Sequence, residues 1–195
     1  FGCVAEDGSG IGMADQVLNW PPFPPLRWKQ ISWSGDVVLR SWAGFPTRRG
    51  ASDGKVGLTV MPADEARRIP PRPGQVRAFQ YLLDHELEIR DAIVQAIFDE
   101  FPAIQDSLSY GGEEADMMPD IDNPEQLRPL IGMSTVHVLT ITRAAMAYVG
   151  FEFGCTWDPE LGLGVMTHAD RVVEVGGADV SFLEWVAERD AESEE

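Results

Sequence analysis

The sequence has few cysteines and no long apolar run. Its two cysteines, Cys3 and Cys155, lie far apart, one in a Gly-rich terminus and one in an apolar segment. This excludes a disulfide-stapled scaffold, and we expect two free thiols in a reducing compartment. No apolar stretch approaches the roughly 18 residues of a transmembrane helix, and the chain start lacks the features of a signal peptide. We therefore expect a cytoplasmic protein.

Basic residues are scarce in the second half of the chain. Residues 101–195 hold 4 Lys or Arg against 19 Asp or Glu, a net charge of −15, whereas residues 1–100 hold 11 against 13. Such a field repels nucleic-acid phosphates and anionic membrane surfaces, so we expect neither as a partner. It favours a basic protein partner. The alternative is that the acidic residues only keep the domain soluble.

The motifs of several enzyme classes are also missing. The glycines at positions 8, 10 and 12 follow no predicted strand and precede no helix start, so they do not indicate a phosphate-binding loop. No serine lies in the nucleophile elbow of a hydrolase. The sequence therefore predicts no nucleotide cofactor.

Metal ligands are not arranged as in known motifs. The three histidines and two cysteines do not pair at the short spacings of zinc sites. The carboxylates between Gly111 and Glu125 resemble calcium ligands in number, but their spacing is not that of an EF-hand loop. We expect a solvated loop and no metal, with calcium binding by this loop as the alternative.

Proline and glycine mark the beginning of the chain. Residues 1–30 are first Gly-rich and then Pro-rich, which predicts a poorly ordered start followed by an extended arm against the domain surface. A ligand for a proline-recognising module is the alternative. We expect a single domain over residues 31–189 and an acidic tail over residues 190–195.

The apolar pattern predicts an α+β fold. Alternation of apolar and polar residues indicates strands at Ile31–Trp42 and Lys55–Met61, joined as an antiparallel hairpin, and a central strand at Ile131–Thr142. Helical spacing predicts helices over residues 74–84 and 86–100, the second ended by Pro102, and a short helix over Ser181–Arg189. We expect an antiparallel β-sheet with the helical pair packed on one face.

The stretch from Ala147 to Phe182 is the predicted centre of the fold, with two or three antiparallel strands. The turn WDPELGLG within it holds the candidate site residues Trp157, Asp158, Glu160, Gly162 and Gly164. Asp158 favours a turn, the glycines allow positive φ or close backbone approach, and Trp157 caps the core. Glu160 either accepts backbone N–H bonds of the turn or contacts a ligand.

A second hypothesis for this stretch is that it forms the active site of an enzyme. Cys155 and His168 would face one another across the hairpin as a thiolate and its base, with Glu160 nearby. The same residues also fit a purely structural role, because an unpaired cysteine in an apolar strand is commonly a small core residue. The enzymatic reading requires that the three side chains meet at one open pocket.

The run GFEFGCTWDPELGLGVMTHADRVVEVGGADVSF resembles the C-terminal signature of an uncharacterised bacterial domain family. In that signature a Trp-Asp-x-Glu-His-Gly-x-Gly-Val turn precedes an Arg-Val-Val-x-x-Gly strand and an Ala-Asp pair. Leu161 stands here where the family has His, which argues against a catalytic imidazole at this position. The run PGQVRAFQYLL resembles the family's first helix, so the similarity covers roughly residues 35–185. No established activity is implied by the resemblance.

These observations favour a non-enzymatic binding domain whose acidic C-terminal half meets a basic protein partner. Small acidic α+β domains of this kind occur among bacterial immunity proteins that neutralise toxins, and this analogy suggests one form of the hypothesis. The competing hypothesis is a hydrolase or small-ligand enzyme that uses Glu160, His168 and Cys155. The sequence indicates no oligomeric state.

Overall fold

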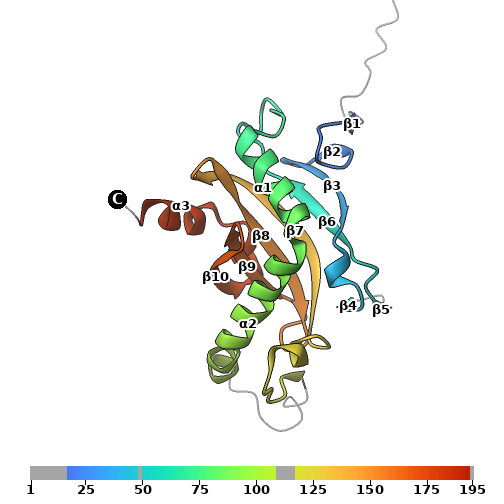
Figure 1. Cartoon of the computed structure of the whole chain (residues 1–195), viewed down its shortest axis with the longest axis vertical. Helices are drawn as coiled ribbons and strands as arrows, with labels where there is room; N and C mark the ends of the chain where they lie inside the picture. The colour runs from blue at the N-terminus through green and yellow to red at the C-terminus, as the bar shows by residue number, and fades with distance from the viewer. Residues whose placement is uncertain (1–16, 48–49, 109–116, 194–195) are drawn as a thin grey trace, which may run out of the picture.

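A computed structural model describes residues 17–47, 50–108 and 117–193 and shows mixed α and β content, in agreement with the expected α+β class (Figure 1). Eight strands form the main sheet in the order β1-β2-β3-β6-β7-β8-β9-β10, and β4 and β5 pair separately. The strands are β1 (Val17–Leu18), β2 (Leu26–Lys29), β3 (Ser32–Val38), β4 (Pro46–Thr47), β5 (Gly50–Ala51), β6 (Lys55–Val60), β7 (Ile131–Arg143), β8 (Met146–Cys155), β9 (Leu163–His168) and β10 (Arg171–Gly177). The helices are α1 (Pro73–Asp84), α2 (Glu86–Leu108) and α3 (Glu184–Glu192), with short 3-10 turns η2 (Arg40–Trp42), η4 (Pro124–Leu127) and η5 (Ala178–Ser181).

The sheet is not purely antiparallel, which corrects the expectation from the sequence. β6 and β7 lie side by side in the same direction, with Leu58 opposite Val136, whereas the other neighbouring strands of the main sheet are antiparallel. The reason lies in the connection, because α1 and α2 follow β6 and carry the chain back before β7 begins. Parallel neighbours need a crossover of this kind, and alternation of apolar residues says nothing about strand direction.

The first expected hairpin forms between β3 and β6, with Val37 opposite Val56. β3 is shorter than the sequence indicates, because the chain leaves the sheet after Val38 and makes the turn η2. Trp42 in this turn is 2% exposed and packs against Phe153 of β8, with 5.2 Å between the ring centroids. The free energy gained by burying this large aromatic ring exceeds the free energy that continued strand pairing would supply.

Helix α1 begins at Pro73, whose fixed φ suits the first helical turn. Gln75 in this turn is 1% exposed, and its amide group donates to the carbonyl oxygens of Met61 at 2.8 Å and Val138 at 3.2 Å. Its Oε1 atom accepts the N–H of Arg72 at 2.9 Å. A buried amide with these partners fixes the start of the helix against the end of β6 and the middle of β7.

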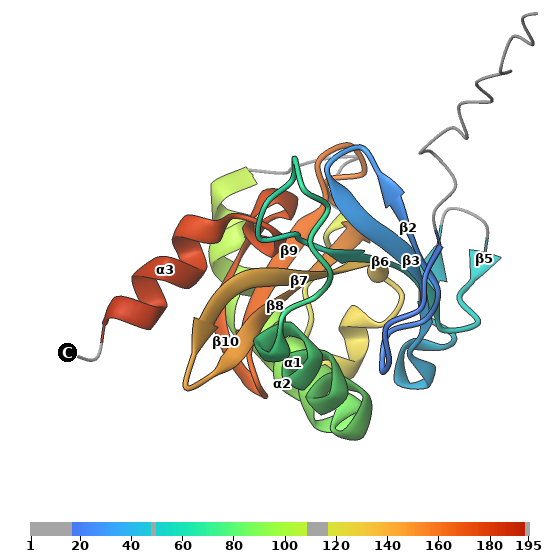
Figure 2. The same ribbon diagram turned by 90° about the horizontal axis from the view of Figure 1, so that it is seen from above.

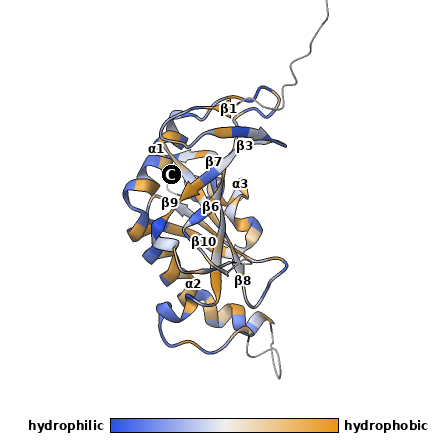
Figure 3. Cartoon of the chain, turned by 90° about the vertical axis from the view of Figure 1, so that its right-hand side faces the viewer, coloured by the Kyte–Doolittle hydropathy of each residue, from blue (hydrophilic) through white to orange (hydrophobic). Residues whose placement is uncertain are grey.

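Helix α2 runs to Leu108 with Pro102 inside it, so the expected end at this proline is wrong. Pro102 lacks the N–H that would bond to the carbonyl of Phe98, and a helix tolerates this loss where packing holds both sides. Phe101 supplies such packing, since it is 2% exposed and meets the ring of Trp157 edge-on at 5.3 Å. Hydrophobic and hydrophilic segments alternate along α2, as expected for a half-buried helix (Figure 3).

Two groups of buried side chains occupy opposite faces of the sheet. The larger one joins Val149 and Phe151 of β8 to α1 and α2. The smaller one joins Tyr148 of β8 and Met166 of β9 to Val186 of α3. Figure 2 shows α3 on the other side of β7 from α1. Neighbouring residues of a strand point to opposite faces, so the alternation Tyr148, Val149 decides which helix each side chain meets.

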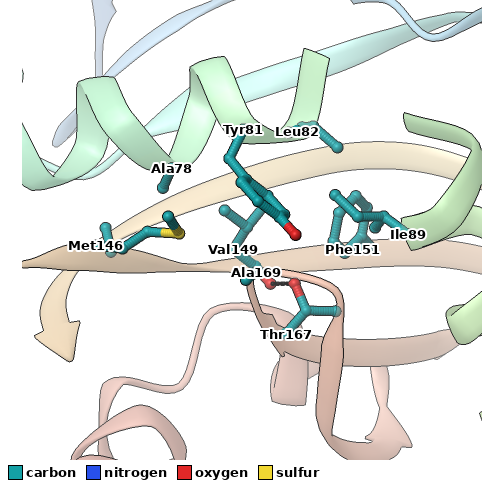
Figure 4. A pocket seen from close by; sticks show the side chains of 10 residues that line it. Ala78, Tyr81, Leu82, Ile89, Met146, Val149, Phe151, Thr167 and Ala169 are labelled. Atoms are coloured by element: carbon teal, nitrogen blue, oxygen red, sulfur yellow. Dashed lines mark hydrogen bonds between the residues drawn. The ribbon is translucent and has the colours of Figure 1, made fainter. Parts of the chain in front are cut away.

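A small cavity lies between α1 and the sheet. Its volume is about 10 Å³, and its lining includes Tyr81, Val149 and Thr167 (Figure 4). The Thr167 hydroxyl donates to the carbonyl oxygen of Val149 at 3.1 Å. A cavity of this size is at the lower limit for one water molecule, so it is a gap in the packing and no ligand site.

The two ends of the chain differ from the expected arm and acidic tail. β1 and β2 fall in the segment expected to be an arm, and both lie in the main sheet. Asp190, expected to open the acidic tail, lies within α3. The Gly-rich start with Cys3, residues 109–116 of the carboxylate-rich loop and the last two residues of the tail lie outside the described residues. No helix among the residues described is both long and apolar enough to cross a membrane.

Candidate functional site

The expected turn joins β8 to β9, and close backbone contacts fix it. Trp157 is 2% exposed beneath Phe101. Gly162 has a φ of 75°, and a Cβ there would lie 2.4 Å from the carbonyl oxygen of Phe153. At Gly164 a Cβ would lie 2.5 Å from the carbonyl oxygen of Gly177. Only glycine fits both positions.

Asp158 organises the backbone of this turn, a role considered for Glu160. The Oδ1 atom of Asp158 accepts the N–H of Leu161 at 2.9 Å, and its carbonyl oxygen accepts the N–H of Gly162 at 2.9 Å. Aspartate commonly closes turns in this way. Glu160 is exposed beside Leu161, whose side chain is 74% exposed.

The structure separates Cys155 from His168, so the catalytic group of the alternative hypothesis does not form. Thr167 pairs with Val149, which places His168 opposite Tyr148 and seven positions from Cys155 along β8. At about 3.3 Å per residue this is about 23 Å. Cys155 belongs to the core on the α1 and α2 side, whereas His168 packs its ring on Tyr148 of the other face, with 4.8 Å between centroids.

Cys155 is also unsuited to nucleophilic chemistry. It is a free thiol, 7% exposed, with its Sγ atom 3.5 Å from the carbonyl oxygen of Asp158. Burial in the core raises the pKa of the Cys155 thiol to about 11. The thiolate is the reactive form, and this environment opposes it. Cys155 is a core residue.

An open groove lies on the sheet face that points away from the larger buried group. Its floor is a row of three side chains on neighbouring strands: Ser34 of β3 pairs with Thr59 of β6, and Thr59 pairs with His137 of β7. Paired residues point to the same face, so the register itself brings these groups together. Next in the row comes Gly150 of β8. A Cβ at Gly150 would lie 1.6 Å from the carbonyl oxygen of Ser181, because η5 packs directly on this strand and closes the row.

The walls of the groove come from two loops. One wall holds Lys29 at the end of β2 and Ile31 of the turn between β2 and β3, and the other holds Phe182, the residue after η5. Ile31 and Phe182 are 51% and 42% exposed, and the Phe182 ring lies edge-on to His137 at 5.5 Å. The groove has a volume of about 740 Å³, within the range of about 300 to 1,000 Å³ typical of small-molecule sites.

His137 is held in place by a carboxylate. It is 9% exposed, and its Nε2 atom lies 3.2 Å from Oε2 of Glu152 on β8. The other carboxylate oxygen accepts the hydroxyl of Ser134 at 3.2 Å. The hydrogen bond from His137 lowers the pKa of the Glu152 carboxyl and outweighs the opposing effect of burial. An ionised Glu152 requires a proton on Nε2, which leaves Nδ1 of a neutral ring as a hydrogen-bond acceptor.

Outside the groove, the Asp190 carboxylate binds charged and polar side chains on the sheet face that α3 covers. Its carboxylate accepts hydrogen bonds from Arg143 at 3.1 Å, from Arg171 at 2.5 and 3.0 Å, and from the Tyr148 hydroxyl at 2.7 Å. The bonds from Arg171 contribute most to holding the pKa of the Asp190 carboxyl well below its usual range, against the effect of burial. The cluster fastens α3 to β7, β8 and β10.

Metal ligands do not gather in the part of the chain that the structure describes. Within it, no three His, Cys, Asp or Glu side chains are placed to share an ion. Asp120, a member of the carboxylate-rich loop, accepts a hydrogen bond from Gln105 of α2 at 3.1 Å. Residues 109–116 of that loop, which hold part of the calcium alternative, lie outside the described residues.

Sequence reasoning missed the groove residues. His137 was weighed only as a zinc ligand, and Glu152 and Phe182 were not singled out. One signal was present: in STVHV the apolar Val136 and Val138 alternate with Thr135 and His137, which places the imidazole on the side away from the core. Nothing local relates that position to Ser34 or Phe182, which are far away in the chain.

The described residues form an α+β domain with one partly open sheet face. Comparison with known families assigns no activity to this domain. Residues 45–183 match the family model of a domain of unknown function, DUF6985. The chain belongs to this family, which confirms that it is a member of an uncharacterised family. No curated protein and no solved structure matches the chain.

Proposed function

We propose that this chain is a non-enzymatic bacterial binding domain, located in the cytoplasm, that binds a basic protein partner through its acidic C-terminal half. A toxin-neutralising role of the immunity type is part of the proposal. The proposal also includes the expected packing of the helical pair on one face of the sheet, with α3 and the groove on the other face. The support begins with the net charge of −15 on residues 101–195. Such a field speeds association with a cationic surface.

The observation that carries the proposal is an exposed tryptophan among carboxylates on α3. We call Glu184, Trp185, Glu188 and Glu192 the α3 surface. The three glutamates are exposed and four positions apart, so they share one side of the helix. Trp185 is 50% exposed, with the guanidinium of Arg189 5.0 Å from its ring centroid. Exposed tryptophans are frequent centres of binding energy in protein interfaces.

The α3 surface is also rigidly attached. Val186 and Ala187 are fully buried on the inner side of the helix, and Asp190 is bound by Arg143 and Arg171. A surface that is ordered before binding loses little conformational entropy in the complex. This favours tight binding from a small helix.

The partner expected for an immunity-type protein is the product of a neighbouring toxin gene. Co-expression of that product with the chain should restore growth, and the complex should dissociate in moderate salt because exposed charges are screened. Trp185→Ala and the charge reversal Glu188→Lys with Glu192→Lys should each weaken the complex at least about tenfold. The matched control is Glu100→Lys with Asp106→Lys on α2, which changes the net charge equally.

The control separates a local contact from the overall charge. If the α2 reversal weakens binding as much as the α3 reversal, the interaction depends only on net charge and α3 is not the contact surface. If the purified chain binds no basic neighbour product at low salt and does not restore growth, the proposed function is wrong.

A further inference from the structure

We propose that the groove, with its volume of about 740 Å³, is a binding site for an uncharged carbohydrate such as a disaccharide, a function separate from partner binding at α3. Ser34, Thr59 and His137 stand on three neighbouring strands, about 4.8 Å apart. Ser32 adds a third hydroxyl, with its Oγ atom 3.5 Å from that of Ser34.

The floor suits a ligand that both donates and accepts hydrogen bonds. Serine and threonine hydroxyls do both, and Nδ1 of His137 accepts when the ring is neutral. The hydroxyl groups of a sugar have the same double capacity and stand a few ångströms apart around the ring. A ligand of this chemistry would satisfy the floor without any charged group of its own.

The charges around the groove disfavour an ionic ligand of either sign. Glu152 and His137 already satisfy one another at 3.2 Å. The net charge of −17 repels an anion from the molecule as a whole. Lys29 at the rim of the groove repels a cation. An uncharged polar ligand meets neither repulsion and leaves the pair of His137 and Glu152 intact.

The walls supply the apolar contact that a sugar ring needs. The C–H faces of sugars pack on aromatic rings, and Phe182 presents such a ring at 42% exposure. Phe182 is held in position, because its N–H and that of Leu183 both donate to the carbonyl oxygen of Asp179 at 3.0 Å. Ile31 on the other wall and Met61 beside the floor complete the apolar part of the lining.

The test uses the full chain and a defined panel: maltose, cellobiose, lactose and diacetylchitobiose, with acetate, inorganic phosphate and lysine as charged comparators. Binding is followed by isothermal calorimetry and by the NMR signals of the histidine rings. At least one neutral disaccharide should bind and shift the signals of His137 while those of His85 stay in place. Phe182→Ala should weaken this binding about tenfold, and Ser34→Ala with Thr59→Ala should weaken it further.

The control is Trp185→Ala, an exposed aromatic residue outside the groove, which should leave sugar binding unchanged. Circular dichroism establishes that each variant is folded. The proposal is overturned if no disaccharide binds at tens of millimolar, if Phe182→Ala binds as the wild type does, or if a charged comparator takes the site instead. Because the α3 variants and the groove variants are distinct, failure here leaves partner binding unaffected.

Discussion

The phenol of Tyr148 donates a hydrogen bond of 2.7 Å to Oδ2 of Asp190, and this bond joins the middle of the sheet to the last helix. The same carboxylate accepts from two arginines, so one side chain holds α3 by contacts to three strands. Its side chain is 13% exposed, which makes the contacts stronger than those of a surface ion pair. The position of α3 therefore depends on Asp190.

Asp190→Asn should destabilise the domain by about 2 kcal/mol, because the change removes the carboxylate that both Arg143 and Arg171 bind while preserving volume. Urea unfolding followed by circular dichroism measures the difference. Glu188→Gln, an exposed change on the same helix, is the control and should stay within about 0.5 kcal/mol. Equal unfolding midpoints for Asp190→Asn and the wild type would show that α3 is held by its apolar side alone.

Acid should remove this stabilisation. The pKa of Asp190 is lower in the folded chain than in the unfolded one, so the stabilisation is fully present above the unfolded pKa and is lost as the pH falls through the folded pKa. The stability gap between the wild type and Asp190→Asn should be constant from pH 7 to pH 5 and shrink below about pH 4. Urea midpoints of both proteins across this range test it, and a gap that widens with acid contradicts the argument.

High pH should ionise Tyr148, the donor of the hydrogen bond to Asp190. Burial, together with the hydrogen bond to Asp190, raises the pKa of Tyr148 to about 12. Stabilisation by the neutral phenol is thus complete below the ordinary pKa of about 10 and is lost as the pH rises toward 12. The ultraviolet titration of the wild type minus that of Tyr148→Phe isolates this group. A midpoint near 10 in the folded protein would be the contrary result.

The turn between β8 and β9 should tolerate no side chain at Gly162. Gly162→Ala places a Cβ against the carbonyl of Phe153 at a φ of 75°, and we expect a loss of at least about 1 kcal/mol. Gly154→Ala is the matched control, because a Cβ there meets no atom within 4 Å. Thermal unfolding compares the two. Similar melting temperatures would mean that the turn relaxes readily.

Cys155 should be unreactive while the chain is folded. With a pKa of about 11, about a thousandth of the thiol is ionised at pH 8. In a Cys3→Ser variant, which keeps Cys155 as the single thiol, labelling by a disulfide reagent should be slow in buffer and fast in urea. Labelling in buffer at the rate of a small free thiol would contradict the burial of this residue.

Much of the secondary structure could be predicted because its signals are local. The predicted central strand at Ile131–Thr142 is present as β7, with Val136 and Val138 fully buried, and it has a register shift between Val138 and Thr142. Pro102 misled the prediction of α2, since the packing of Phe101 on Trp157 is a contact between distant segments. The parallel pairing of β6 and β7 has the same origin, because strand direction depends on the path of the connecting helices.

The candidate site was harder to predict for a related reason. Asp158 and Gly162 lie in one turn, so their roles follow from residue type and spacing. Ser34, Thr59 and His137 meet only through the register of β3, β6 and β7, which no short sequence motif encodes. The hypothesis of an enzyme built on Cys155 and His168 failed for the same reason. The register of β8 and β9 sets both the distance between the two residues along the strands and the sheet face on which each side chain lies.

The family match begins at residue 45, after β3, and ends at residue 183, before α3. Of the groove residues, His137 and Phe182 lie inside the matched range, whereas Ile31 and Ser34 lie before it. The α3 surface lies after the matched range. Membership of the family therefore covers neither proposed binding surface in full, so a binding activity measured for this chain does not pass to another member through the family match alone.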